Sequence, residues 1–309
     1  MLGGELAAIE RIRVILGGVP PAGETWIGDD AAVVGTSGLG EHLLLTSDAV
    51  VGGVHADLGL VGLDDFGWKA MAAALSDIAA MGGRPCNALV SVIGPPDTDL
   101  ALLYRGLSDA ALHWACPIVG GDLVSAPLLV VSVSVTGAAP TGLRPVLRSG
   151  ARAGDYVFVT GPLGSSAAGL ARLRCGDLDD IGARLALAHR RPLARVDEGL
   201  AAASAGATAM IDVSDGLATD LGHLAQASSV GFDLEWIPVA TGADESDALG
   251  GGEDYELVFT APDAEAVMAG FDLCAMRPPL MIGRCSSQRS GRRLRGEQLG
   301  RFGWEHEWN

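Results

Sequence analysis

Residues 128–137 show the clearest alternation of apolar and polar side chains in the chain. Apolar side chains occupy every odd position from 129 to 135, and hydroxylated side chains occupy positions 132, 134 and 136. A period of two is typical of a strand with one buried face. The run therefore predicts a strand that packs against a core on one side only.

Residues 66–81 are rich in alanine, which favours a helix. Asp64 and Asp65 precede this stretch where an N-cap is expected, and Gly82-Gly83 follows it as a stop signal. On such a helix Asp77 shares one stripe mostly with alanines. A carboxylate that faces a core is costly unless it is paired or bound to metal. We therefore expect Asp77 to ligate a metal or to pair with an arginine, and both alternatives stay open.

Further short apolar runs and helical patterns alternate along the rest of the chain. The predicted strands span 31–34, 42–46, 86–93, 118–121, 155–160, 209–213, 232–236 and 255–260. The predicted helices span 1–15, 101–115 and 165–174, with one more after Gly216. This alternation predicts an α/β protein with mixed sheets. Glycine and proline cluster at 138–154, so we place a boundary there between domains at 1–140 and 141–309.

The composition excludes several classes of protein. The 309 residues carry a net charge of −17, which argues against nucleic-acid binding. No run of eighteen apolar residues predicts a membrane span, and residues 1–15 lack the pattern of a signal peptide. The five cysteines are scattered without a CxxC pair, as expected of reduced thiols in a cytoplasmic protein. Solubility alone explains the acidity, and a polyanionic ligand would need a divalent metal as intermediary.

Five aspartates lie where predicted strands begin or end: Asp30, Asp48, Asp122, Asp212 and Asp215. Ligand sites of open α/β sheets collect at strand ends, and carboxylates are the hard ligands that Mg²⁺ prefers. Each aspartate taken singly is also explained as a turn or capping residue. The set together favours a metal site.

Two basic residues beside the predicted strands could contact a ligand. Arg148 lies at the predicted domain junction, where a guanidinium could clamp a phosphate or remain a solvated linker residue. His55 follows the turn Gly52-Gly53 and could touch substrate or be incidental. The glycine turns include no phosphate loop of the G-x-x-x-x-G-K-[ST] type, and no motif for a covalent nucleophile is present.

Seven motifs follow one another over most of the chain. They are Gly28-Asp-Asp30, Thr46-Ser-Asp48 with Gly53-Val-His55, Lys69 to Gly82 with Leu75-Ser-Asp77, Gly120-Gly-Asp122, Arg148-Ser-Gly150, Ile211-Asp-Val-Ser-Asp-Gly216 and Gly251-Gly-Glu-Asp-Tyr-Glu-Leu257. In this order the motifs resemble the thiamine-monophosphate kinase family. That family belongs to a wider group with aminoimidazole ribonucleotide synthetase, selenophosphate synthetase and a hydrogenase-maturation dehydratase.

The resemblance implies two α/β domains, a homodimer formed by pairing of the N-terminal sheets, and ATP near the dimer interface. It implies several Mg²⁺ ions, with K⁺ as a further candidate, held by Asp30, Thr46, Ser47, Asp48, Asp77, Asp122, Asp212 and Asp215. It implies that ATP meets Tyr104, Gly121, Asp122, Arg148 and Ser214. It also implies that thiamine monophosphate meets His55, Glu253, Asp254 and Trp304.

The resemblance implies that the γ-phosphoryl group of ATP moves directly to thiamine monophosphate and gives thiamine diphosphate, without a catalytic side chain. Selenophosphate synthetase would carry a reactive cysteine or selenocysteine with a lysine in an N-terminal glycine-rich loop, and the hydrogenase-maturation enzyme would end in a reactive cysteine; neither feature is visible. Aminoimidazole ribonucleotide synthetase matches the Asp-Gly pattern less well. A regulatory protein that binds ATP and metal without turnover is the alternative of a different class.

Overall fold

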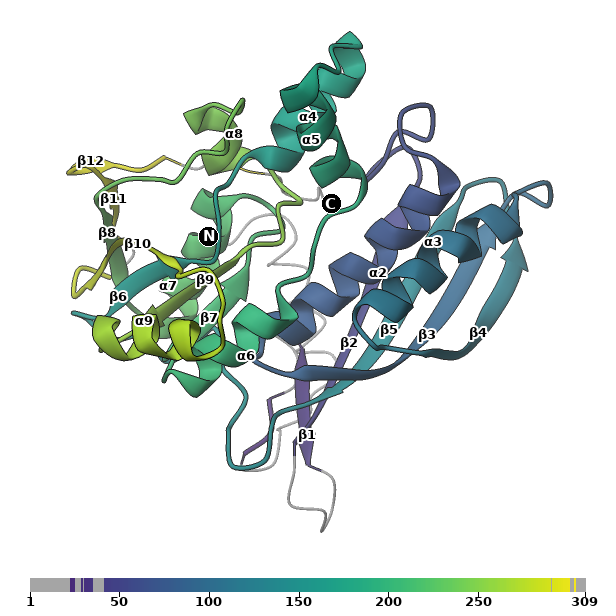
Figure 1. Cartoon of the computed structure of the whole chain (residues 1–309). Coiled ribbons are helices and arrows are strands. Elements are labelled where there is room, and N and C mark those ends of the chain that lie inside the picture. Colours follow the sequence, from purple (N-terminus) through teal and green to yellow (C-terminus); the bar gives the residue numbers. More distant parts are fainter. Residues whose placement is uncertain are drawn as a thin grey trace.

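The computed structural model describes residues 23–25, 29, 31–35, 42–289, 291–300 and 303. The helix predicted at 1–15, Asp30 and Trp304 lie outside the described residues. The described part of the chain forms two β-sheets, each with helices packed beside it (Figure 1). None of its helices is both long and apolar enough to cross a bilayer.

The first sheet has five strands in the order β1-β2-β5-β3-β4. Their bounds are Ala32–Gly35 for β1, His42–Val51 for β2, Arg84–Gly94 for β3, Ile118–Ser125 for β4 and Val130–Ala138 for β5. Neighbouring strands run antiparallel, except that β3 and β4 are parallel. The parallel pair arises because helix α3 connects β3 to β4 as a crossover.

Helices α2 (Leu63–Ala80) and α3 (Leu100–His113) cover one face of this sheet (Figure 1). The predicted alternation in β5 is confirmed, since Val131, Val133 and Val135 are buried against this helical layer. On the opposite face, which we call the open face, Leu45, Leu89 and Val119 are exposed.

The second sheet has seven strands in the order β12-β11-β8-β10-β6-β9-β7. Their bounds are Tyr156–Val159 for β6, Ala209–Asp212 for β7, Gly231–Leu234 for β8, Leu257–Ala261 for β9, Leu280–Ser286 for β10, Arg292–Leu294 for β11 and Glu297–Gln298 for β12. The helices of this half are α4 (Ser165–Cys175), α5 (Asp180–Arg190), α6 (Val196–Ser204), α7 (Leu217–Ser228), α8 (Glu245–Gly250) and α9 (Ala264–Leu273). The predicted boundary at 140/141 falls in the segment between the two sheets, residues 139–155.

Helix α2 joins the two halves because it is buried on nearly every side. It packs on β2 and β5 of the first sheet and on β7 and α6 of the second half. One hydrophobic cluster contains Met71 of α2 together with Met210 of β7 and Phe259 of β9. This shared core fixes the position of α2 relative to both sheets.

Residues 191–195, between α5 and α6, form a second connection between the halves. Arg191 binds Asp64 and Asp65 at the start of α2, with N–O distances of 3.0 and 2.5 Å. The indole N–H of Trp68 donates to the carbonyl of Pro192 at 2.8 Å.

Several predicted boundaries are wrong. Helix α2 begins at Leu63 after Gly62, so Asp64 and Asp65 lie in its first turn. Their negative charges interact favourably there with the helix dipole, and both form ion pairs with Arg191. Strands β2 and β4 continue past the predicted ends, so Asp48 and Asp122 lie within strands. Strand pairing extends both runs despite their polar residues.

Candidate active site

Helix α2 presents hydroxyl and carboxyl groups to both halves of the protein. Ser76 is fully buried and donates its hydroxyl hydrogen bond to Asp212 at the end of β7, with an O–O distance of 2.7 Å. Asp77, the next residue, accepts a hydrogen bond from the Thr46 hydroxyl on β2. Consecutive helical positions point about 100° apart, so these two side chains reach different sheets. The Thr46 hydroxyl is one partner of Asp77, and a metal ion and an arginine both stay predictions for this carboxylate.

The buried phenol of Tyr255 marks where these carboxylates gather. Its pKa is raised well above the usual value, first by burial and then by negative charges on Glu253, Asp48, Asp212 and Asp77. These carboxylates come from the segment before β9, from β2, from β7 and from α2. The structure therefore brings predicted metal ligands from both halves to one region.

The loop after β7 contains a buried carboxylate that the sequence reasoning missed. Asp220, in the first turn of α7, accepts hydrogen bonds from the backbone N–H groups of Asp215 and Gly216 at 3.2 and 3.1 Å. Burial raises its pKa well above the usual value, and the charges of Asp215 and Asp212 raise it further. Asp220 thereby fixes the turn that carries Asp215. An acidic residue four positions after Gly216, at a helix start, was the available signal.

Ser47 and Asp122 lie away from this group. Ser47 is exposed on the other face of β2, where its hydroxyl lies 2.9 Å from that of Ser134 on β5. Asp122 is exposed within β4 and pairs in register with Ser91 of β3, so it lies on the same open face. Three strand spacings separate β4 from β2, roughly 14 Å. Within one chain, Asp122 is therefore not among the gathered carboxylates.

The residues expected to meet ATP fall into two places. Tyr104 is on α3, and burial raises the pKa of its phenol. Gly121 precedes Asp122 in β4 with φ of +153°, and a Cβ there would lie 1.7 Å from the carbonyl oxygen of Val90. Only glycine fits this position. Tyr104, Gly121 and Asp122 therefore all belong to the first half.

Arg148 and Ser214 belong to the other place, beside the loop that Asp220 fixes. The backbone N–H of Arg148 donates to Asp29 at 3.1 Å, and its carbonyl accepts from Ser228 at 2.7 Å. The positive charge of Arg148 acts to lower the pKa of Asp220. The carbonyl of Ser214 accepts from the backbone N–H of Glu253 at 2.8 Å. The second half of the ATP set thus lies beside the predicted substrate segment.

Two residues expected to meet the substrate are held by backbone groups. The Nδ1 atom of His55 lies 3.0 Å from the backbone N–H of Val51, so Nδ1 accepts and the ring proton is on Nε2. Asp254 accepts from the backbone N–H groups of Gly164 at 2.5 Å and Ser166 at 3.0 Å. Burial raises the pKa of Asp254 to about 7, against these hydrogen bonds.

Glu253 has two buried partners that sequence reasoning missed. Its Oε2 lies 2.8 Å from Nζ of Lys69 and 3.6 Å from Nδ1 of His189. Lys69 is fully buried within α2, and its Nζ also lies 3.5 Å from the carbonyl oxygen of His55. The available signal was the single lysine of the chain, which lies in the alanine-rich part of α2.

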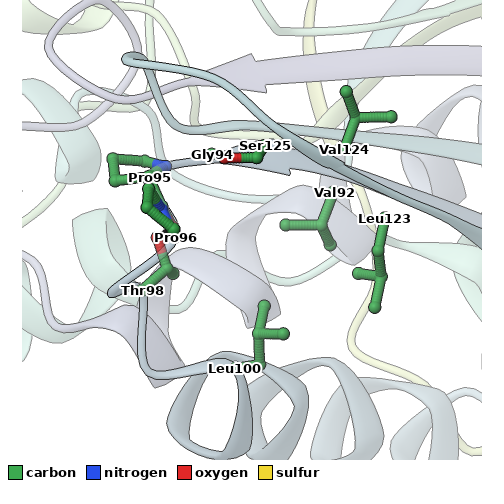
Figure 2. Close-up of a pocket in the computed structure, with 9 residues that line it drawn as sticks. All are labelled: Val92, Gly94, Pro95, Pro96, Thr98, Leu100, Leu123, Val124 and Ser125. Carbon is green, nitrogen blue, oxygen red and sulfur yellow. Dashed lines mark hydrogen bonds between the residues drawn. The ribbon is translucent and has the colours of Figure 1, made fainter.

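The described residues include no group of three or more His, Cys, Asp and Glu side chains close enough to hold one metal ion. Asp30, which is part of the predicted set, lies outside the described residues. A small cavity of about 160 Å³ lies where β3 and β4 end beside α3, lined by Val92, Pro95 and Leu100 among others (Figure 2). None of the predicted site residues lines it.

Two adjoining α/β halves with acidic residues at their junction define the class of this protein. Residues 28–139 match the family described as AIR synthase related protein, N-terminal domain, and residues 152–286 match the corresponding C-terminal domain. The chain is therefore an AIR synthase related protein.

The relatives of this chain define the family within that class. It is 41% identical to the thiamine-monophosphate kinase of Mycobacterium tuberculosis over 82% of this chain and 80% of that protein. It is 38% identical to the thiamine-monophosphate kinase of Escherichia coli over 78% and 77%. A solved structure described as "AaThiL complexed with AMPPCP and TMP" matches with a TM-score of 0.86 and 32% identity over 98% and 97% of the two chains. The chain belongs to the thiamine-monophosphate kinase family.

Proposed function

We propose that this protein transfers the γ-phosphoryl group of ATP to thiamine monophosphate and forms thiamine diphosphate. The observation that carries the proposal is the gathering of Asp48, Asp77 and Asp212 around Tyr255, from elements of both halves. The relative described with AMPPCP and TMP supports the choice of both reactants.

The acceptor chemistry requires no general base. The second pKa of a phosphate monoester is about 6, so the attacking oxygen is mostly ionised at neutral pH. The difficulty is to bring two polyanions together in line, which is a matter of positioning and charge. The absence of a nucleophile motif from the sequence agrees with direct transfer.

The side chains of Thr46, Asp48, Asp77 and Asp212 fit Mg²⁺ because they offer hydroxyl and carboxylate oxygens. No three acidic side chains of the described residues are close enough to hold one ion between them, so these residues, with Asp215 on the adjoining loop, would each supply ligands to one of several ions. When bound, the ions would neutralise phosphate charge there. Asp30, Ser47 and Asp122 remain proposed ligands from the sequence, as does K⁺ as a further ion.

The chain's own groups would then orient the reactants. His55 carries its proton on Nε2 and can donate a hydrogen bond to a phosphate oxygen. The guanidinium of Arg148 and the hydroxyl of Ser214 lie beside the acidic loop, where they can meet the phosphates of ATP. Glu253, Asp254 and Trp304 are the proposed contacts for the rest of thiamine monophosphate.

A homodimer through the open face of the first sheet is part of the proposal. On this face Leu45, Leu89 and Val119 are exposed, at 37%, 51% and 61%. A hollow of about 640 Å³ on this face is lined by Leu45, Ser47, Leu89 and Val119 among others. Exposed apolar patches of this kind favour a partner surface. A second copy of the chain over this face would also enclose Asp122, which supports an ATP site near the interface.

A cytoplasmic location is proposed from the cysteines. All five are free in the structure, which agrees with a reducing compartment.

An assay of ADP release with Mg²⁺ tests the function, offering thiamine monophosphate, thiamine and an aminoimidazole-type ribonucleotide in turn. Thiamine diphosphate should form only from the first. Asp48→Asn and Asp122→Asn should each abolish turnover with an unchanged circular dichroism spectrum. Asp177→Asn, in the surface pair with Arg172, is the matched control. Near-normal kcat in either site variant at saturating Mg²⁺, or ATP binding without ADP release, would refute the proposal.

A further inference from the structure

The only lysine of the chain is completely buried at the junction of the two halves. Its side-chain nitrogen contacts Glu253 Oε2 at 2.8 Å and the backbone carbonyl of His55 at 3.5 Å. His55 follows β2 in the first half, and Glu253 precedes β9 in the second. Lys69 therefore bridges two segments that are 198 positions apart in the chain.

A buried ammonium group is costly unless its charge is balanced. Glu253 is the acidic partner of Lys69, and its own side chain is only 22% exposed. The neighbouring imidazole of His189 is buried and neutral, because burial and the charges of Lys69, Arg174 and Arg190 lower its pKa to about 3. Lys69 and Glu253 thus balance each other, and no second cation contacts this pair among the residues that the structure describes.

The backbone at Glu253 is strained, and the contact of its side chain with Lys69 helps to hold it in that conformation. Glu253 has φ of +66°, and Tyr255 has φ of +51°. Non-glycine residues rarely adopt this region and hold it only where their surroundings determine it. The backbone N–H of Glu253 is fixed on Ser214 and its side chain on Lys69. This arrangement sets the direction of the carboxylate.

The two oxygens of Glu253 have different environments. Oε2 faces Lys69 and His189. Oε1 has no hydrogen-bond partner among the residues that the structure describes, and the side chain is partly exposed. One oxygen is therefore anchored in the protein, which leaves the other to meet a ligand.

We infer that Lys69 is a positioning residue for thiamine monophosphate, because its ammonium group holds the Glu253 carboxylate and the His55 loop at a fixed separation. The inference rests on the proposed function, since His55 and Glu253 are the proposed substrate contacts. Lys69 itself acts through these two residues. Its loss should weaken binding of thiamine monophosphate and leave binding of the nucleotide nearly unchanged.

Calorimetric titration of the full-length protein tests this with Lys69→Met, a buried apolar substitution of similar length. The dissociation constant for thiamine monophosphate should rise at least about tenfold, and that for a non-hydrolysable ATP analogue less than about twofold. Lys69→Arg should recover part of the affinity because it keeps the charge. The double variant Lys69→Met/Glu253→Gln should bind no worse than the weaker single variant, because the pair acts as one unit.

Arg191→Met is the matched control. Arg191 also joins the halves through carboxylates on α2, so its loss should lower the melting temperature without selective loss of thiamine monophosphate binding. A purely structural Lys69 would behave in the same way. Equal affinities for thiamine monophosphate in wild type and folded Lys69→Met would overturn the inference.

Nuclear magnetic resonance of the wild-type protein keeps the inference testable if Lys69→Met does not fold. Labelling with ¹³C,¹⁵N-lysine gives a single lysine side chain, which should shift on addition of thiamine monophosphate and stay in place with the ATP analogue. An unchanged signal at saturating thiamine monophosphate would contradict the inference. A wild-type protein that neither binds nor phosphorylates thiamine monophosphate would instead refute the proposed function.

Discussion

Removing the Ser76 hydroxyl tests whether α2 and β7 are coupled through the acidic region. Ser76 donates to Asp212 across the junction of the two halves at 2.7 Å, and both side chains are buried. In Ser76→Ala the carboxylate loses one of its donors, and water has little access to replace it. We expect both lower stability and weaker activity.

The expected loss of stability follows from the charge on the acceptor. A hydrogen bond to a charged group contributes about 1.5–3 kcal/mol, against about 1 kcal/mol for a neutral pair. The unfolding entropy of a 309-residue chain is roughly 0.65 kcal/mol/K at about 2.1 cal/mol/K per residue. The melting temperature should therefore fall by about 2–5 °C. The lost donor also leaves the Asp212 carboxylate less firmly positioned, so turnover should fall at every pH.

Differential scanning calorimetry measures the first effect, and turnover of thiamine monophosphate from pH 6 to 9 measures the second. Thr98→Ala is the control, because the Thr98 hydroxyl donates to the neutral carbonyl of Pro95 at 2.7 Å, away from the acidic region. It should cost about 1 kcal/mol at most and leave the pH profile unchanged. A melting temperature within about 1 °C of wild type for Ser76→Ala, with wild-type turnover at every pH, would refute the coupling.

Three further changes have defined outcomes. His189→Gln should flatten the pH dependence of the free energy of unfolding. The histidine takes up a proton below pH of about 6.5 in the unfolded chain, whereas burial lowers its pKa to about 3 in the folded protein. Between these two pH values His189 makes the free energy of unfolding rise with pH, by up to about 1.4 kcal/mol per pH unit. Asp254, with its pKa raised to about 7, acts in the opposite direction, so the variant and wild-type denaturation curves must be compared at each pH. Leu89→Asp should give a particle of 31.5 kDa in light scattering, where the proposed homodimer of the wild type would have twice that mass. Gly106→Ala should lower the free energy of unfolding by about 3 kcal/mol or more, because the added Cβ would lie 1.6 Å from the Asp64 carbonyl oxygen.

Local patterns were sufficient to predict most elements that form the first half. The period of two in β5 arises because only one face of that strand is buried. The alanine-rich run in α2 arises because that helix is buried on nearly every side. Helices α5, α6, α8 and α9 and strands β10 to β12 were missed. Among them α8 has six residues and β11 and β12 have only three and two, so the stability of these three depends on tertiary packing that no local pattern contains.

The sequence predicted which residue types form the site better than it predicted how they are arranged in space. Aspartates at strand ends and on α2 indicated an acidic region, and the contacts of Asp77 and Asp212 agree with that position. The face on which a residue lies depends on strand register, which placed Ser47 opposite Thr46 and Asp122 across the sheet. The sequence marked Lys69 only as the first residue of the motif Lys69 to Gly82, because its partner Glu253 is distant in sequence.

Helix α2 also sets the distance between the two ends of the proposed site, at Lys69 and at Ser76. Lys69 and Ser76 are seven positions apart, so they lie on the same side of the helix at roughly 10 Å along its axis. A rigid helix keeps this length, whereas the surrounding loops can adjust. One inserted residue between them would rotate Ser76 by about 100° and break its alignment with β7. To fit a phosphoryl acceptor of a different length, the spacing on α2 would therefore have to change before the loops around the site.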